Sequence, residues 1–193
     1  MTNSKKIRKL GIDGENSVAA FLGNLPAEEY YIINNLLLKT PKGSTQIDHV
    51  VVSPYGVFVI ETKNHKGMIF GDCFSKDWTQ TLYTKRGIKS FTFYSPYLQN
   101  IGHINHLIKD YGIPPQVLQG MIVFSNVNAN LRNVNCITFN PYTMFHYIRQ
   151  HTIPIINYTE MLNIISCLHY NNIESARNNK RHIKFVKSMK LGG

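Results

Sequence analysis

Two runs of mainly apolar residues lie close together near residue 55 and predict a β-hairpin. The runs cover residues 46–52 and 57–63, and residues 53–56 (Ser-Pro-Tyr-Gly) join them. Val, Ile and Phe dominate both runs, and Pro-Tyr-Gly is typical of a turn. We therefore predict two antiparallel strands that carry acids and a lysine at their open end.

Alternation along the second strand places its acid and its lysine on one face, because successive side chains of a strand point to opposite sides. The side chains that share this face are those of Val57, Val59, Glu61 and Lys63. Phe58, Ile60 and Thr62 take the other face.

The turn fixes which residues face each other across the hairpin. If Ser53 faces Gly56, then Asp48 lies opposite Glu61, at a Cβ separation of about 5 Å. Two carboxylates at that distance repel unless they share a proton or a cation, and Mg²⁺ prefers such oxygen ligands. Lys63 then supplies the charge that steers a water or a phosphate.

Two alternatives remain open for this hairpin. A left-handed bulge at Gly56 would shift the register by one residue and turn Asp48 away from Glu61. Alternatively, Asp48, Glu61 and Lys63 form ordinary salt bridges at strand ends.

A fourth polar residue lies on the apolar stripe of a predicted N-terminal helix over residues 12–23. Helical spacing puts Glu15 in line with Val18 and Leu22, and therefore toward the core. A buried carboxylate needs a partner, because an unpaired buried charge costs several kcal/mol. The alternative is a first-turn glutamate near an Asp13 cap, favoured by the helix dipole.

The rest of the pattern predicts an α/β fold. Trp78 is expected to fill core volume. The other predicted elements are strands near 29–38, 68–71, 78–94 and 117–124, and helices near 96–111, 141–151 and 159–170.

Several separate blocks of the chain resemble one known family. They are Gly14-Glu15, residues 46–49, residues 56–64, residues 95–100 with His103, and residues 121–125. In this order they resemble the NERD (nuclease-related) domain of the PD-(D/E)xK nuclease superfamily, over about residues 11–126. The resemblance implies a restriction-endonuclease-like core, with a mixed central β-sheet flanked by helices.

The resemblance also implies a metal-dependent phosphodiesterase. Its acids map onto Glu15, Asp48 and Glu61, its catalytic lysine onto Lys63 and an accessory polar group onto Gln99. Asp48 and Glu61, with the backbone carbonyl of Thr62, are expected to hold Mg²⁺ or Mn²⁺, and Glu15 either to complete the shell or to help hold a second ion.

Three function classes follow. The first is a nuclease acting on DNA, alone or with a helicase or other partner recruited in trans. The second is a basic nucleic-acid-binding module that keeps the fold without cleaving, and the third is a protein-interaction domain. The acids and Lys63 together favour the first, because a pure binding module has no physical need for three acids near a polyanion.

Charge fits a nucleic-acid partner. The chain has 21 Lys and Arg against 11 Asp and Glu, a formal net charge of +10. Basic residues concentrate at 5–9 and 177–190, with Lys85, Arg86 and Lys89 between, although such runs also occur on solvated faces. Aromatic residues lie near this middle group, and their alternation favours strand core over a base-stacking platform; they are Tyr83, Phe91, Phe93 and Tyr94.

Length and composition predict one domain over residues 1–193, with a core at about 11–126 and a helical C-terminal part at about 140–190. No apolar run approaches the roughly 20 residues that cross a bilayer. Cys73, Cys136 and Cys167 are odd in number and lack C-x-x-C spacing, so we expect neither a disulfide framework nor a zinc site, and a reducing cytoplasm.

Overall fold

The structure is a computed structural model that describes residues 3–41 and 43–173. Its central sheet has four strands in the order β1-β2-β3-β7. They are β1 (Tyr31–Thr40), β2 (Gly43–Ser53), β3 (Gly56–Lys63) and β7 (Leu118–Phe124). β2 is antiparallel to both β1 and β3, whereas β7 is parallel to β3, so the sheet is mixed.

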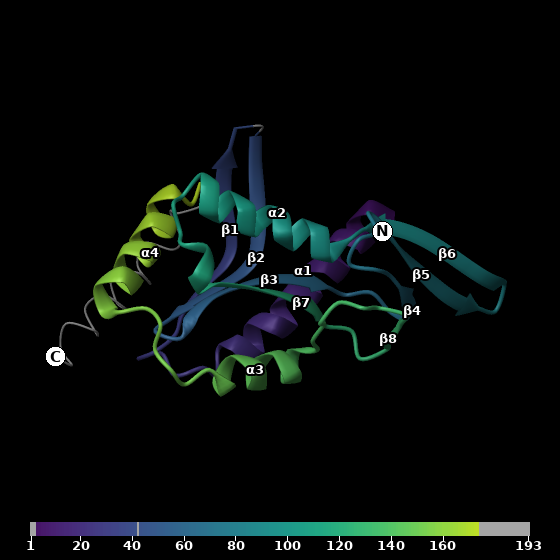
Figure 1. Ribbon diagram of the computed structural model, residues 1–193. Coiled ribbons are helices and arrows are strands. Elements are labelled where there is room, and N and C mark those ends of the chain that lie inside the picture. The colour runs from purple at the N-terminus through teal and green to yellow at the C-terminus, as the bar shows by residue number, and fades with distance from the viewer. Residues whose placement is uncertain (1–2, 42, 174–193) are drawn as a thin grey trace.

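Two pairs of helices cover the two faces of this sheet (Figure 1). α1 (Asn3–Leu22) and α3 (Pro141–Gln150) pack on the face that carries Phe58 and Ile60. α2 (Pro96–Lys109) and α4 (Tyr158–Asn171) pack on the face that carries Val57 and Val59. The predicted α/β class, with a mixed sheet flanked by helices, is confirmed.

The hairpin has the predicted register. Ser53 faces Gly56, and the ladder continues to the pair His49 and Ile60. Gly56 adopts a positive φ of 140°, yet the register does not shift. Asp48 and Glu61 are therefore next in line at the open end of the hairpin, and the bulge alternative is wrong.

A second four-stranded sheet lies beside the C-terminal end of β3, in the order β6-β5-β4-β8. Its strands are β4 (Gly67–Phe70), β5 (Asp77–Thr84), β6 (Gly87–Tyr94) and β8 (Ala129–Arg132). The strand predicted at 68–71 forms as β4 and lies in this second sheet, whereas β7 is the fourth strand of the central sheet. β4 instead pairs in parallel with β8, because the chain turns after β3 at Gly67, where φ is +83°.

The second sheet builds its own apolar cluster against β7. Trp78 is fully buried there and stacks on Phe124, with ring centroids 6.3 Å apart. The predicted packing role of Trp78 is confirmed.

A disulfide joins Cys73 and Cys136, so the expectation of no disulfide is wrong. Cys73 follows β4 and Cys136 follows β8. Because these two strands run side by side in parallel, the loops after them meet, and the two Cα atoms lie 5.5 Å apart. A separation of 63 residues hid this pairing in the sequence.

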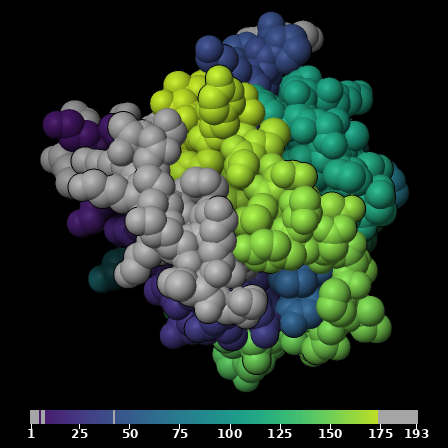
Figure 2. Space-filling model, turned by 90° about the vertical axis from the view of Figure 1, so that its left-hand side faces the viewer, coloured from purple at the N-terminus to yellow at the C-terminus, as the bar shows by residue number. Residues whose placement is uncertain are grey.

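The helices agree with prediction except at the N-terminus. α1 begins at Asn3 rather than near residue 12, so Asp13 lies inside the helix and cannot cap it. α3 and α4 lie within a residue of the predicted bounds, and Figure 2 shows α4 beside the end of α2 on the surface. The predicted helical and basic residues after 173 lie outside the described part of the chain.

Within the described residues, no helix combines the length and apolar character needed to cross a membrane.

Candidate active site

Three of the predicted residues meet at the end of β3, beneath the first turns of α2. Glu61 is almost completely buried, at 1% exposure, and its Oε1 forms an ion pair with Lys63 Nζ. Gln99 of α2 also approaches this ammonium, with its Oε1 3.1 Å from Lys63 Nζ. Glu61, Lys63 and Gln99 therefore form one connected group.

Asp48 reaches the same place from β2. Its Oδ2 accepts a hydrogen bond from the backbone N–H of Thr62 at 2.8 Å. Burial, and secondly the charge of Glu61, raise the pKa of Asp48 to about 7, although the Thr62 N–H and Lys63 act in the opposite direction. The carboxyl group is thus held in a site that disfavours its charge.

Glu15 approaches from α1, on the other layer of the molecule, and is half-buried. Burial raises the pKa of Glu15, and Glu61 raises it further, so the two carboxylates interact. Gly14 makes this approach possible. A Cβ at Gly14 would lie 2.6 Å from Asn64 Cβ and 2.7 Å from Ser125 Oγ, so a side chain would push α1 away from the strand ends.

A buried histidine completes the surroundings of Glu61. His103 Nε2 lies 3.3 Å from Glu61 Oε2, and His103 Nδ1 lies 2.9 Å from Thr45 Oγ1. A carboxylate only accepts hydrogen bonds, so Nε2 donates, and in the neutral ring Nδ1 accepts from the Thr45 hydroxyl. His103 belongs to one of the blocks that resemble the family, whereas nothing in the sequence pointed to Thr45.

Asn100 fixes α2 on the sheet and was not predicted. Its Nδ2 donates to the carbonyls of Val59 at 3.0 Å and Met121 at 3.1 Å, on the neighbouring strands β3 and β7. Its side chain is buried, so these bonds hold the helix that carries Gln99 and His103 at a fixed height above Glu61. The available signal in the sequence was that helical spacing puts Asn100 on the same side of α2 as Pro96 and Leu107, both of which are buried.

Two other histidines lie near the acids without joining them. His49 lies on the opposite sheet face, where its Nδ1 donates to Asn34 Oδ1 at 2.8 Å. Burial lowers the pKa of His49 to about 4, so the ring is neutral near pH 7. His65 stacks on Phe93 with centroids 4.3 Å apart, and its Nδ1 lies 3.2 Å from Gln80 Oε1.

Comparison with protein families places the chain in a known family. The model of the nuclease-related domain, NERD, matches residues 10–125, which is more than half of the chain. The chain belongs to the NERD family. The match contains all five predicted catalytic residues and the whole of the central sheet.

Two individual proteins resemble this NERD domain. An uncharacterized protein of Bacillus anthracis, pXO1-01, is 29% identical over 182 residues, which cover 91% of this chain and 83% of that protein. The crystal structure of a protein of unknown function, AF1548, is 12% identical with a TM-score of 0.33, over 95% of this chain and 100% of the other.

The donor set of the NERD domain suits a hard divalent cation. Within the described residues, no three or more His, Cys, Asp or Glu side chains are grouped closely enough to form a complete metal cage. Mg²⁺ does not need one, because it is commonly bound through one or two carboxylates together with waters and phosphates. Asp48 and Glu61 meet this requirement. Burial first and the charge of Glu61 second raise the pKa of Asp48, and a cation would relieve the repulsion between the two carboxylates.

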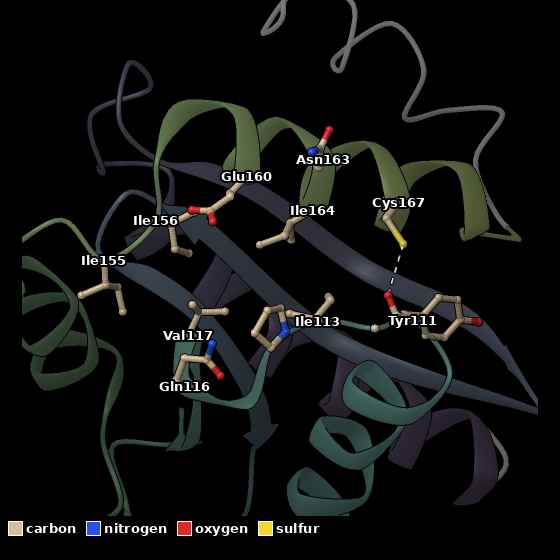
Figure 3. Close-up of a pocket in the computed structure, with 12 residues that line it drawn as sticks. Tyr111, Ile113, Gln116, Val117, Ile155, Ile156, Glu160, Asn163, Ile164 and Cys167 are labelled. Atoms are coloured by element: carbon tan, nitrogen blue, oxygen red, sulfur yellow. Dashed lines mark hydrogen bonds between the residues drawn. The ribbon is translucent and has the colours of Figure 1, made fainter.

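The acids of the NERD domain are separate from two hollows on the described surface. One, of about 370 Å³, lies between α4 and the short helix η1 (Pro115–Val117), with Ile113 and Ile164 among its walls (Figure 3). The other, of about 590 Å³, lies beside α3 and the β7–β8 loop. Neither is lined by any of the predicted site residues.

Proposed function

We propose that this NERD domain is a metal-dependent nuclease that hydrolyses phosphodiester bonds in DNA. The single observation that carries the proposal is that Asp48 of β2 and Glu61 of β3 meet beside Lys63, with Glu15 of α1 near enough for Glu61 to raise its pKa. In a chain with a net charge of +10, a site of clustered acids works against binding a polyanion. Metal-dependent chemistry gives the acids a use that simple binding does not.

Asp48 and Glu61 would hold Mg²⁺ or Mn²⁺, together with the backbone carbonyl of Thr62, and Glu15 would complete the shell. The bound ion would supply charge to the scissile phosphate and lower the pKa of an attacking water. His103 keeps one Glu61 oxygen oriented through its Nε2 contact, and the Thr62 N–H does the same for Asp48.

Lys63 would stabilise the negative charge that builds on phosphorus, or orient the attacking water. Preorganised charge of this kind contributes several kcal/mol in other enzymes. Gln99 holds the ammonium from the α2 side at 3.1 Å, so Lys63 has a second anchor besides Glu61. Gln99 is therefore an accessory group that positions the catalytic lysine.

The proposal also covers the partner and the substrate. Nucleic acid is the partner, with DNA as the substrate, and a helicase or another protein acting in trans would supply unwinding or targeting. The cytoplasm was expected from the absence of a disulfide, and the Cys73–Cys136 bond removes that ground.

A non-cleaving nucleic-acid-binding module is the second candidate. The ion pair of Lys63 with Glu61 favours it, because this ammonium already neutralises one of the two carboxylates that a metal would use. In such a module the acids would bind no metal, and Lys63 and His103 would serve only to stabilise the buried Glu61.

The test is cleavage of labelled linear, circular, single-stranded and branched DNA, with an RNA control, in Mg²⁺, Mn²⁺ or EDTA. The proposal predicts cutting of DNA by the parent protein with either metal and none in EDTA. Retention of DNA in a gel shift without cutting in any metal would move the assignment to the binding module.

Substitutions locate the activity. Asp48→Ala and Glu61→Ala should each reduce cleavage by at least about 100-fold, because they remove metal ligands, while DNA affinity stays equal or rises as negative charge is lost. Lys63→Ala should reduce turnover more than metal affinity. Glu28→Ala, at an exposed glutamate in the α1–β1 loop, is the matched control and should cleave like the parent. Equal activity in all variants would refute the site.

A further inference from the structure

The outer part of the β5–β6 hairpin forms an arm, defined as residues 80–91, that projects from the body of the molecule (Figure 1). Tyr83, Ile88 and Phe91 are 69%, 65% and 50% exposed on it. Tyr94 at its base is 47% exposed, so the expectation that these aromatic residues form strand core is wrong for all but Phe93, which packs partly buried against the cluster of Trp78. An alternating pattern shows that a strand has two faces, not that either face is covered.

The arm is exposed on both of its faces. Tyr83 faces Ile88 on one side, and Gln80 faces Phe91 on the other, because paired residues of a ladder share a face. Every residue from 83 to 92 is exposed. Beyond Thr81, the last residue of β5 that pairs with β4, the arm is thus a two-stranded ribbon and not the surface of a layered sheet.

The charge of the arm has one sign. Lys85, Arg86 and Lys89 are all exposed at or near its tip. No acidic residue occurs between positions 78 and 109 in the sequence. The arm therefore attracts polyanions without local compensation.

The base of the arm is attached directly to the candidate active site. The chain leaves the site at Lys63, the last residue of β3, and returns to it at Gln99, in the first turn of α2. Between these points it builds the three strands β4, β5 and β6. His65, stacked on Phe93 and bonded to Gln80, fixes the base of the arm two residues after the catalytic lysine.

We infer that the arm enters the major groove of a DNA duplex and positions the duplex at Lys63. The groove is about 12 Å wide and admits a two-stranded β-ribbon. A ribbon exposed on both faces fits between the groove walls, where Arg86 and Lys89 meet phosphates on either side. Base-stacking platforms, in contrast, present one face of a sheet that is backed by a core. The inference rests on the proposed function for the identity of the partner.

The test measures duplex binding in EDTA, so it needs no cleavage. Fluorescence anisotropy with a 20-base-pair duplex between 0.05 and 0.3 M salt would compare the parent with the double variant Arg86→Ala/Lys89→Ala. We expect at least about a 10-fold loss of affinity at 0.1 M salt, and a salt slope lower by about 1.8, since each lost phosphate contact contributes about 0.9. Phe91→Ala should weaken binding severalfold, whereas Tyr170→Ala, at an exposed aromatic of α4, should not.

The matched control is Lys39→Ala/Lys109→Ala, which removes the same charge at two exposed positions, one near the end of β1 and one in the last turn of α2. It should lose less than about 3-fold in affinity. Equal losses of duplex affinity in the two double variants would overturn the inference. So would an arm variant that loses affinity for a single-stranded 20-mer but not for the duplex. Parent-like duplex binding by the arm variant would also overturn it, and would assign the exposed aromatics to a protein partner.

The two proposals fail in different ways. A parent that binds duplex through the arm but never cuts refutes the nuclease and leaves the arm in place. A parent that cuts in Mn²⁺ and whose arm variant binds normally refutes only the arm.

Discussion

Asp48 is the residue whose environment most clearly opposes its own charge. It is largely buried, Glu61 and Glu15 both add repulsion, and its pKa rises from an ordinary value of 3.8 to about 7. The folded protein therefore holds this proton more tightly than the unfolded chain does. Between about pH 4 and pH 7, ionisation of Asp48 reduces the free energy of unfolding as the pH rises.

Asp48→Asn should therefore stabilise the protein in EDTA, and more so at high pH. The amide keeps an oxygen acceptor for the Thr62 N–H but carries no charge. Relative to the parent, the free energy of unfolding should rise by at most about 1.4 kcal/mol for each pH unit between pH 4 and pH 7, and then level off. Thermal unfolding at several pH values measures this, and a difference that does not change with pH would contradict it.

His49 contributes with the opposite sign in an overlapping range. Its pKa falls to about 4 because of burial, so the unfolded chain binds a proton more readily than the folded protein does below pH 6.5. Stability from the neutral ring is present above pH 6.5 and is lost as the pH falls toward 4. The Asp48→Asn variant, which retains His49, should show this acid loss without the compensation from Asp48.

At the scale of elements, α1 is placed by a glycine within its own length. Glycine inside a helix usually costs about 0.5–1 kcal/mol relative to alanine. Gly14 is nonetheless required, because a Cβ there would collide with Asn64 and Ser125 at the ends of β3 and β7. The helix gives up some intrinsic stability and gains the close approach that brings Glu15 toward Glu61.

Gly14→Ala should thus destabilise the protein, against the usual sign for such a change in a helix. Overpacking of this kind costs about 1–3 kcal/mol, and cleavage should fall because Glu15 moves away from the other acids. Chemical unfolding and the cleavage assay measure the two effects.

Gly11→Ala on the same helix is the control. Its new Cβ would meet only Glu15 Oε1, at 3.9 Å, an ordinary contact. The variant should be as stable as the parent or more stable by up to about 1 kcal/mol. If both alanine variants behave alike, the close packing of α1 on the strand ends does not position Glu15.

At the scale of the whole molecule, two chain segments connect the central sheet to the second one. β3 continues into β4 and β7 continues into β8, and the two segments stay paired in parallel through both sheets. The backbone bonds from Ser125 N to Lys63 O and from Gly67 N to Asn128 O bridge the gap between the sheets. The site therefore lies at the junction, with the helical layers on one side and the arm on the other.

The sequence predicted the parts of this arrangement that depend on local rules. The turn at 53–56 sets the hairpin register, and the register alone brings Asp48 toward Glu61. Helical spacing placed Glu15 with Val18 and Leu22, both now buried.

What could not be predicted depends on contacts between distant segments. β8 is only four residues long, too short for the alternation of Ala129 and Leu131 with polar residues to predict a strand, so its pairing with β4 defines it. The disulfide depends on the same pairing. The carbonyl contacts of Asn100 and the Thr45 contact of His103 depend on where α2 crosses the sheet, which no local pattern specifies.

The central claim is that Asp48 and Glu61 bind a divalent cation, and the most direct test is Mn²⁺ binding by isothermal titration calorimetry. This measurement needs no knowledge of the substrate. The parent and Glu28→Gln should bind Mn²⁺ with the same affinity, whereas Asp48→Asn and Glu61→Gln should each bind at least about 10-fold more weakly, because each loses a ligand that tunes the site. Equal Mn²⁺ binding by all four proteins, or no binding by the parent, would contradict the account.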